Sequence, residues 1–537
     1  MNLIWLLLKE SWPIAVASLL MGLISGGSAA SLIAIVNLAL SETQFSQSLL
    51  AFAFVALCLL QFFTRFFSEV LLSRLGNGVS YRLRMVLSKR ILASSLHHLE
   101  AVGGPSLMAS LTKDINSISN TILIIPFLFS NITIVIGCLI YLGILSWQVL
   151  LIFFAVLFLC IISIYFLQVK AFAALDTVRQ GEDKLFEHYK TLMEGIKELK
   201  LNSDRRAAFL NEDLNLTTLA LKDKSISAER FFAACVSWQQ IILFAVVGGL
   251  LFLLPIFQNI SLAILSSYIL TILYLANYLG VIIEMFPSIS RAKIALDKID
   301  KLKLGLAENS EKNANKTNNL NSDWQQLKLK NVTHTYRTDT EDSNFILGEI
   351  DLTFNAGELV FIIGGNGSGK STLAKLITGL YIPESGKIYL DNQEINDENR
   401  EEYRNLFSVI FGDFYLFDRL LGFKNIDLKA EKYLQKLQLE KKLKIENGKL
   451  STINLSQGQR KRLALLTAYL EDRPIYLFDE WASDQDPTFK NIFYRELLPE
   501  LIANKKTVFV ISHDDRYFDI ADRIIKLDYG KVIQDLR

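Results

Sequence analysis

The sequence LVFIIGGNGSGKSTLAKL, residues 359–376, decides the fold of the C-terminal half of this 537-residue chain. It begins as an apolar strand, passes through a glycine-rich turn and ends at the start of a helix. Gly364 to Ser371 fits the pattern G-x-x-x-x-G-K-S in the context that the pattern requires. Glycines let backbone N–H groups converge on phosphate oxygens, and the helix N-terminus adds a positive dipole end. The stretch therefore predicts a loop that binds nucleotide phosphates.

Two side chains of this loop have specific expected roles. Lys370 is expected to reach the β- and γ-phosphates and to take part in catalysis, and the Ser371 hydroxyl is expected to bind Mg²⁺. ATP and Mg²⁺ are therefore the expected ligands. The residues expected around the phosphates are Gly364, Gly365, Asn366, Gly367, Ser368, Gly369, Lys370, Ser371 and Thr372.

Two further apolar runs end in polar residues. PIYLFDE, residues 474–480, ends in two carboxylates, and a lone carboxylate among buried neighbours is costly. We expect Asp479 to hold Mg²⁺, directly or through water, and Glu480 to act as general base for the attacking water. TVFVISHD, residues 507–514, ends near His513, which we expect to contact the γ-phosphate because α/β sheets bind ligands at strand ends.

The chain from about residue 326 alternates strand-like and helical runs, which indicates an α/β domain with a parallel sheet. Before it lies AENSEKNANKTNNLNSD, residues 307–323, which is polar and Asn-rich as linkers are. We therefore place a linker at 306–325 and a nucleotide-binding domain at 326–537.

The N-terminal half has a different composition. Six long apolar stretches occur there, each about as long as the roughly 20 residues needed to cross a bilayer. They lie at about 13–40, 48–72, 120–145, 147–169, 231–256 and 262–287. The first is too long and too weakly charged at its start for a cleaved signal peptide. We expect an all-α membrane domain of six helices at 1–305, and the net charge of +1 gives no support for a nucleic-acid partner.

The charge of the loops predicts the orientation of these helices. The short loops near 41–47, 146 and 257–261 contain no Lys or Arg, whereas the long connections 73–118 and 170–230 are rich in both. Because basic loops stay in the cytoplasm, we expect both termini and the nucleotide-binding domain to be cytoplasmic. Both long connections are expected to continue the membrane helices as water-exposed helices.

The run INLSQGQRKRL, residues 453–463, contains no metal ligand and no candidate acid or base. An LSxGQ sequence between a phosphate loop and an Asp-Glu strand resembles the signature of ABC ATPases, and the order of motifs agrees. The resemblance implies that Ser456, Gly458 and Gln459 complete the ATP site of a second subunit, so that the active unit is a homodimer. It also implies a helical subdomain at about 413–470.

Two other elements match the family less evenly, and the basic residues after the signature leave an alternative open. Tyr336 lies where these proteins stack an aromatic ring on adenine, although core packing is the alternative. The basic residues 460–462 belong either to a solvated face or to a charged contact. Gly412 stands where most members have a Gln that relays the nucleotide state, so the resemblance leaves coupling to the backbone, to water or to neighbours such as Asp413.

Six spans ahead of one ATPase domain resemble an ABC exporter half-transporter of the bacterial inner membrane. EGIKELKLNSDRRAAFL, residues 194–210, and FGDFYLFDRLLG, residues 411–422, resemble the branch that exports cyclic peptides and siderophores. The resemblance implies ATP-driven export of a small peptide-like cargo, with a coupling element within 194–206. A lipid or lipid-linked glycan flippase is the alternative, and a non-pumping regulator or channel is a third possibility.

Polar residues at membrane depth suggest where cargo would bind. The candidates are Gln239, Gln240, Tyr274, Asn277 and Tyr278, of which the last three recur with helical spacing in the sixth span. Such groups face either a cavity or another helix, and helix–helix hydrogen bonds remain an equal alternative. Arg65 and Glu69, four residues apart, lie near the cytoplasmic end of the second span. Snorkelling or an intrahelical pair explains them more simply than cargo binding.

Overall fold

The computed structural model describes residues 3–40, 46–257, 262–302, 323–336, 345–423 and 426–537. The chain divides into two compact units. The helical unit comprises Met1–Met85 and Ala109–Ile299, and the sheet unit comprises Val86–Met108 and Asp300–Arg537. The linker proposed at 306–325 lies almost entirely outside the described residues.

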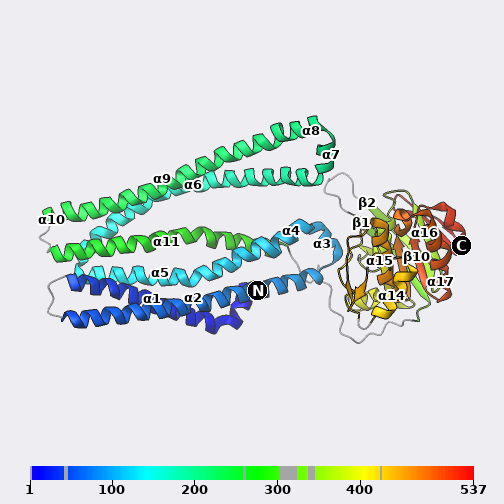
Figure 1. Cartoon of the computed structure of the whole chain (residues 1–537), viewed down its shortest axis with the longest axis horizontal. Coiled ribbons are helices and arrows are strands. Elements are labelled where there is room, and N and C mark those ends of the chain that lie inside the picture. Colours follow the sequence, from blue (N-terminus) through cyan, green and yellow to red (C-terminus); the bar gives the residue numbers. More distant parts are fainter. Residues whose placement is uncertain (1–2, 41–45, 258–261, 303–322, 337–344, 424–425) are drawn as a thin grey trace. The chain divides into compact units, whose positions relative to one another are not determined.

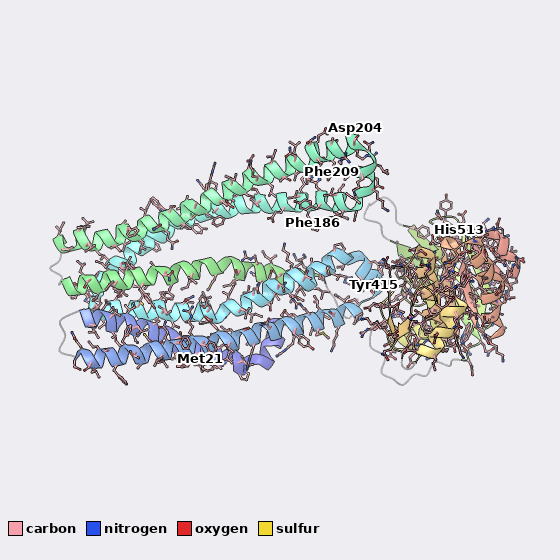
Figure 2. All side chains as sticks on the ribbon, viewed as in Figure 1. Met21, Phe186, Asp204, Phe209, Tyr415 and His513 are labelled. Atoms are coloured by element: carbon pink, nitrogen blue, oxygen red, sulfur yellow. The ribbon has the colours of Figure 1, made fainter. Side chains whose placement is uncertain are left out.

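The helical unit consists of long helices, as the sequence predicts (Figure 1). The long helices are α1 (Leu3–Leu40), α2 (Gln47–Leu92), α5 (Ile115–Leu145), α6 (Trp147–Glu194), α9 (Asn215–Gly248) and α11 (Leu262–Lys301). Short helices α7 (Ile196–Leu201) and α8 (Ser203–Ala208) connect α6 to α9, and α10 (Leu254–Phe257) follows α9. Asp204 and Phe209 lie at the α8 end of this hairpin (Figure 2), within or next to the predicted coupling element.

Among the described residues, five helical segments are long and apolar enough to cross a membrane. They overlap the predicted spans that begin near residues 13, 48, 120, 231 and 262. The remaining predicted span, 147–169, forms the first part of α6, where many side chains lie outside the described set. α6 has 48 residues and is about 72 Å long, so it exceeds a hydrocarbon core of about 30 Å more than twofold.

Close contacts and hydrogen bonds hold the helices of this unit together. A Cβ on Gly137 would lie 2.7 Å from the Cβ of Ala30, so glycine allows α5 to approach α1. On α11, the buried Tyr268 hydroxyl donates to the Leu142 carbonyl oxygen of α5 at 2.6 Å. These are the interactions expected where lipid removes the hydrophobic drive for helix association.

The sheet unit contains the predicted α/β domain. Its six-stranded sheet has the order β12-β11-β3-β10-β9-β6. The strands are β3 (Leu359–Gly364), β6 (Phe407–Ile410), β9 (Ile475–Asp479), β10 (Thr507–Ile511), β11 (Arg523–Asp528) and β12 (Lys531–Leu536). All neighbouring pairs are parallel except β11 with β12. β3, β10 and β9 lie side by side and are fully buried along most of their length.

An antiparallel sheet, not anticipated from the sequence, has the order β2-β1-β4-β5. Its strands are β1 (Gln326–Tyr336), β2 (Phe345–Asn355), β4 (Ser385–Leu390) and β5 (Gln393–Glu394), and β7 (Ile445–Glu446) pairs with β8 (Lys449–Leu450). The helices are α3 (Leu96–Val102), α4 (Gly104–Ala109), α12 (Lys370–Ile377), α13 (Arg400–Arg404), α14 (Asp427–Lys436), α15 (Gln457–Glu471), α16 (Pro487–Ile492) and α17 (Leu498–Ala503).

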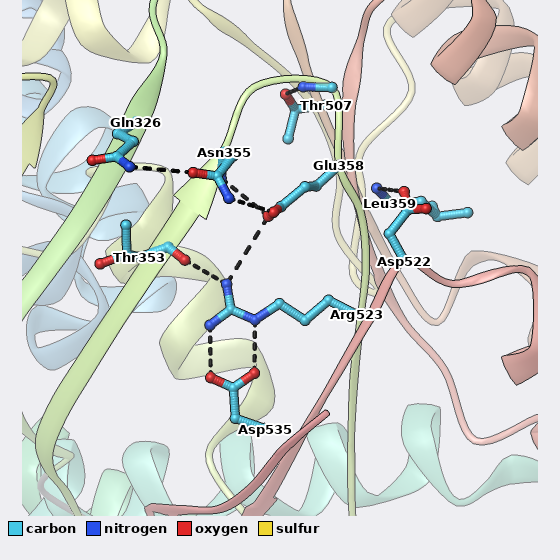
Figure 3. A network of polar contacts seen from close by, with 10 residues as sticks. Gln326, Thr353, Asn355, Glu358, Leu359, Thr507, Asp522, Arg523 and Asp535 are labelled. Atoms are coloured by element: carbon cyan, nitrogen blue, oxygen red, sulfur yellow. Dashed lines mark hydrogen bonds and ion pairs between the residues drawn. The ribbon is translucent and has the colours of Figure 1, made fainter. Parts of the chain in front are cut away.

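Arg523 joins the two larger sheets from a buried position (Figure 3). Its guanidinium donates two hydrogen bonds to Asp535 of β12, each at 2.7 Å, and a third to the Thr353 carbonyl oxygen of β2. The hydrogen bonds from Arg523 lower the pKa of Asp535. At the neighbouring position, the Leu359 N–H at the start of β3 donates to Asp522 at 2.8 Å. The strand that leads into the glycine-rich loop is therefore fixed at its first residue.

Candidate nucleotide site

The glycine-rich loop connects β3 to α12, as the sequence predicts. Gly364 has φ +148°, and a Cβ there would lie 2.2 Å from the Leu527 carbonyl oxygen, so only glycine fits. Lys370 is 6% exposed and donates to two carbonyl oxygens of the loop, both at 2.9 Å. Burial lowers the pKa of Lys370, and the carboxylates of Glu480 and Asp479 oppose that shift. The ammonium group therefore lies inside the curve of the loop, where it could contact a bound phosphate.

Asp479 and Ser371 offer oxygen ligands for a metal ion. Asp479 ends β9 and is 6% exposed; burial raises its pKa, and a hydrogen bond with the Ser371 side chain opposes that shift. A carboxylate beside a hydroxyl is the type of oxygen donor set that Mg²⁺ prefers, so the two residues fit this ion. No group of three or more His, Cys, Asp or Glu side chains could hold a metal in the described part of the chain. Phosphate oxygens and water would supply the remaining ligands.

Glu480 and His513 face the same open space. Glu480 has a left-handed backbone with φ +49°, and its N–H donates to the Ile511 carbonyl oxygen at 3.0 Å. Its Oε1 lies 3.1 Å from Nε2 of His513, and the two side chains are 43% and 45% exposed. Both line a cavity of about 320 Å³. The structure thus brings together the predicted base and the predicted γ-phosphate contact.

The signature sequence forms the N-terminus of α15. Ser456 accepts a hydrogen bond from the Gln459 N–H, and the Gln459 side chain accepts one from the Ser456 N–H. This capping box satisfies the N–H groups of Ser456 and Gln459. The other N–H groups of the first turn have no partner within the helix. A helix N-terminus of this kind binds anions without a catalytic side chain. Packing is tight at Gly458, because a Cβ there would lie 3.0 Å from the Asp484 carbonyl oxygen.

The structure resolves the alternative left open for the basic residues after the signature. Lys461 is 3% exposed, and its ammonium donates to the Glu480 carbonyl oxygen at 2.9 Å and to the Ser483 hydroxyl at 2.7 Å. It also forms an ion pair with Asp484 at 2.7 Å, which lowers the pKa of Asp484. Lys461 therefore holds the left-handed segment that carries the candidate base.

Arg462 makes a second connection between α15 and the loop after Glu480. Its guanidinium donates to Gln485 at 3.0 Å and to Asp486 at 2.6 Å, and lies 3.7 Å from the centre of the Phe489 ring. Gln485 in turn donates to the Gly458 carbonyl oxygen at 3.0 Å. The solvated-face interpretation is therefore wrong for Lys461 and Arg462. The sequence had no signal that separated these residues from an ordinary basic run.

The residues proposed for coupling lie next to the metal-site carboxylate. Gly412 follows β6 and is exposed, and a Cβ there would lie 3.9 Å from the Asp479 carbonyl oxygen. The negative charge of Asp413 acts to raise the pKa of Asp479. Beyond them, Tyr415 and Phe417 are 76% and 56% exposed along an apolar groove of about 300 Å³. Tyr336 ends β1, and its side chain lies outside the described set.

A contact with α12 was not anticipated from the sequence. Glu100 of α3 forms an ion pair with Lys375 at 2.8 Å and a hydrogen bond with the Tyr381 hydroxyl. The rings of His97 and His334 meet edge to face with centroids 5.3 Å apart, and His334 stacks on Tyr381 at 4.6 Å. Residues 86–108 belong to the sheet unit. The helix that begins at the phosphate loop is thus joined to α3.

The predicted cargo residues divide into two groups. Asn277 and Tyr278 line a polar cavity of about 220 Å³ in the helical unit, and the Tyr278 hydroxyl donates to that of Tyr274 at 3.0 Å. Gln239 and Gln240 do not line this cavity, and Gln240 is exposed. Their assignment to cargo binding stays a prediction.

Two family models match this chain. One described as ABC transporter transmembrane region matches residues 9–283, and one described as ABC transporter matches residues 347–483. The ATP-binding protein SyrD of Pseudomonas syringae pv. syringae is 37% identical over 549 residues, which cover 100% of this chain and 96% of SyrD.

Other relatives match shorter parts. The Lactococcin-A transport/processing ATP-binding protein LcnC of Lactococcus lactis subsp. lactis is 28% identical over 295 residues, 52% of this chain and 40% of LcnC. An ATP-dependent lipid A-core flippase of Aliivibrio fischeri is 30% identical over 223 residues, 39% of this chain and 37% of the flippase.

Proposed function

Because this chain belongs to the ABC transporter family, as an ATP-driven exporter half-transporter, we propose that it exports a peptide-like secondary metabolite across the bacterial inner membrane. The cargo class rests on the likeness of residues 194–210 and 411–422 to peptide and siderophore exporters. It is supported by a relative named for lactococcin-A transport.

The observation that carries the ATP-driven part is the arrangement of Lys370, Asp479, Glu480 and His513 at the ends of adjacent strands. Glu480 accepts a proton from the attacking water, and His513 at 3.1 Å orients that carboxylate and contacts the γ-phosphate. Asp479 and Ser371 would hold Mg²⁺, which would supply positive charge against the phosphates. A non-pumping regulator or channel does not need all four of these catalytic and binding side chains.

The working unit that we propose is a homodimer with two shared ATP sites. Ser456 and Gly458 open the N-terminus of α15, and Lys461 on the same helix holds the Glu480 segment of its own chain. In a dimer, each α15 would cap the γ-phosphate bound by the partner and also position the base at its own site. Gly412 and Asp413, beside Asp479, are the proposed route by which the nucleotide state reaches the coupling element.

A lipid or lipid-linked glycan flippase remains the second candidate. One relative is named a lipid A-core flippase, although the match covers 39% of this chain. A phosphate-bearing head group favours a basic cavity, whereas the predicted membrane-core portions of spans three to six contain no Lys or Arg. Peptide export is therefore the better-supported function.

Comparison of exported metabolites tests this proposal. In the bacterium that encodes the chain, a deletion strain should lose a peptide-like compound from its medium. Wild-type protein should restore export, and the Glu480→Gln variant should not. An unchanged set of exported peptides, together with a lipid retained in the inner leaflet of the deletion strain, would favour the flippase instead.

A further inference from the structure

Four helices of the helical unit, α1, α2, α5 and α11, line the polar cavity of about 220 Å³. Nine of its fourteen lining residues have polar or charged side chains. In a bundle that crosses a bilayer, such side chains are costly unless they face a cavity, another helix or a ligand. Segments far apart in the sequence thus contribute polar groups to one place.

Arg65 and Glu69 lie at the wall of this cavity, one turn apart on α2. Nε of Arg65 is 3.2 Å from Oε1 of Glu69, and each side chain is 57% exposed. The intrahelical pair expected from the sequence is therefore confirmed, but much of each charged group is left open to another partner. The pair offers one charge of each sign and adds no net charge to the cavity.

Asn131 of α5 has an unused hydrogen-bond donor in the same cavity. It is 4% exposed, and its Nδ2 has no hydrogen-bond partner among the described residues. An unpaired buried donor is costly, so a protein retains one where it has a use. Helix packing does use other polar groups of this unit: Asn37 donates to Thr271 at 3.3 Å, and Ser68 donates to the Ser18 carbonyl oxygen at 3.0 Å.

We propose that this cavity binds backbone amides of the peptide cargo. Asn131 and Asn277 carry amide groups that both donate and accept hydrogen bonds, as peptide groups do. The Arg65–Glu69 pair supplies one donor and one acceptor that also suit charged peptide termini. The inference rests on the proposed export of a peptide-like compound and names its recognition site. The volume lies below the roughly 300 Å³ at which drug-sized pockets begin, so the cavity holds one segment of a larger molecule.

A phospholipid head group matches this cavity less well. Its phosphate is anionic, and Glu69 lies 3.2 Å from Arg65, so the carboxylate offsets the attraction of the guanidinium. A neutral or zwitterionic peptide segment meets no such repulsion. The balance of charge at the wall therefore favours peptide over phosphate.

Direct binding to the full-length protein in phosphatidylcholine nanodiscs tests the site. The probe is tritiated Leu-Thr-Leu-Thr-Leu, blocked by an N-acetyl and a C-terminal amide group. Asn131→Leu keeps the side-chain size and removes the amide, so affinity for the probe should fall about fivefold to tenfold. The thermal midpoint should stay the same or rise, because the unpaired donor is gone.

Asn120→Leu is the matched control, since Asn120 is an exposed residue of the same helix, about three turns away. It should leave the affinity for the probe unchanged. Unchanged affinity in Asn131→Leu, or an equal loss in Asn120→Leu, overturns the proposal.

The charged pair has a test of its own. The double variant Arg65→Gln with Glu69→Gln preserves net charge and removes both ionic groups. It should weaken binding of the same peptide with free termini about tenfold and that of the blocked peptide much less. Equal losses for the two peptides contradict the assigned role of the pair.

Failure of the site and failure of the proposed cargo give different patterns. If the wild-type protein binds the probe and Asn131→Leu binds it equally well, only the site is wrong. If the wild-type protein hydrolyses ATP but binds neither peptide, the peptide cargo and the site are both wrong. If phosphatidylglycerol added to the nanodiscs displaces the probe, the cavity takes lipid head groups, and the peptide assignment is overturned.

Discussion

In the sheet unit, the buried cations beside the ATP site have several close partners, whereas the charged pair of the helical unit lies half exposed beside a polar cavity. Lys370 and Lys461 are 6% and 3% exposed, and backbone or side-chain oxygens contact both ammonium groups. Arg65 and Glu69 are each 57% exposed. Burial with full pairing fixes one geometry, and a half-open pair can exchange its partner for a ligand.

The difference reflects what each unit must do. Hydrolysis needs one arrangement of base, lysine and metal ligands, so single substitutions there should have large effects. Recognition of a peptide segment is shared among several polar groups, so substitutions in the cavity should have graded effects. The following predictions test this contrast, from the largest expected effect to the smallest.

Glu480→Gln should have the largest effect. It removes the proton acceptor and keeps the shape of the side chain, so ATP turnover should fall by about 10² to 10⁴ while ATP binding persists. Phosphate release from the protein in liposomes measures the loss. Glu496→Gln, at an exposed glutamate of the same unit, is the control. Turnover at the wild-type rate in Glu480→Gln would remove Glu480 as the base.

Ser456→Arg should lower turnover by about 10² to 10³, because it places a cation where the helix N-terminus would meet the partner's γ-phosphate and blocks closure. ATP binding at Lys370 of the same chain should remain largely intact, as equilibrium binding of a fluorescent ATP analogue can show. Loss of binding together with turnover would contradict the shared-site arrangement.

A mixed dimer sharpens this test. One chain carries Ser456→Arg and the other carries Lys370→Ala, and the two are purified through different tags. If the sites are shared, one site combines an intact phosphate loop with an intact signature, so turnover reappears. If each chain holds its own complete site, the mixed dimer stays inactive.

Lys461→Met should lower kcat about tenfold with little change in the KM for ATP, because the Glu480 segment loses its hydrogen bonds to a buried cation. Lys461→Arg should recover part of the loss. Arg460→Met, one residue earlier, is the control. Equal losses at both positions would mean that general damage to the start of α15, not the position of Glu480, explains the effect.

The smallest predicted effect depends on pH. Burial, assisted by the nearby His97, lowers the pKa of His334. The folded state therefore favours neutral His334, and its contribution to stability is lost as pH falls below the ordinary value of about 6.5. Hydrogen exchange of α3, corrected for intrinsic rates, should rise a few-fold between about pH 7.5 and 5.5. His334→Phe keeps the stacking on Tyr381 and should flatten this dependence; an unaltered dependence would assign it to another group.

The sequence predicted the parts of the site that lie within single motifs. The loop of Gly364 to Thr372 and the carboxylates of Asp479 and Glu480 each follow a strand whose apolar pattern is strong. Local pattern was sufficient there because strand, turn and helix start are adjacent in the chain. The strands β1 and β2, like β4 and β5, follow each other in the chain. The pairing of β1 with β4 that joins them, such as Leu327 with Leu390, is distant in sequence, so no local pattern indicated the sheet.

Contacts between motifs could not be predicted. Lys461 looks like part of a solvated basic run until the fold places the Glu480 carbonyl oxygen 2.9 Å from it. Arg65 and Glu69 have the spacing of an ordinary helix pair, and only the packing of four helices shows that they border a cavity. Gly412 has no side chain that could indicate its place beside Asp479. In each case, tertiary neighbours decide the role.

Helix α12 is a short, direct connection between the phosphate loop and α3. It has eight residues and is about 12 Å long; Lys370 at its first position holds the phosphate loop, and Lys375 in its last turn holds Glu100 of α3. A helix this short bends little, so a displacement of Lys370 would reach the Lys375–Glu100 ion pair through one rigid element.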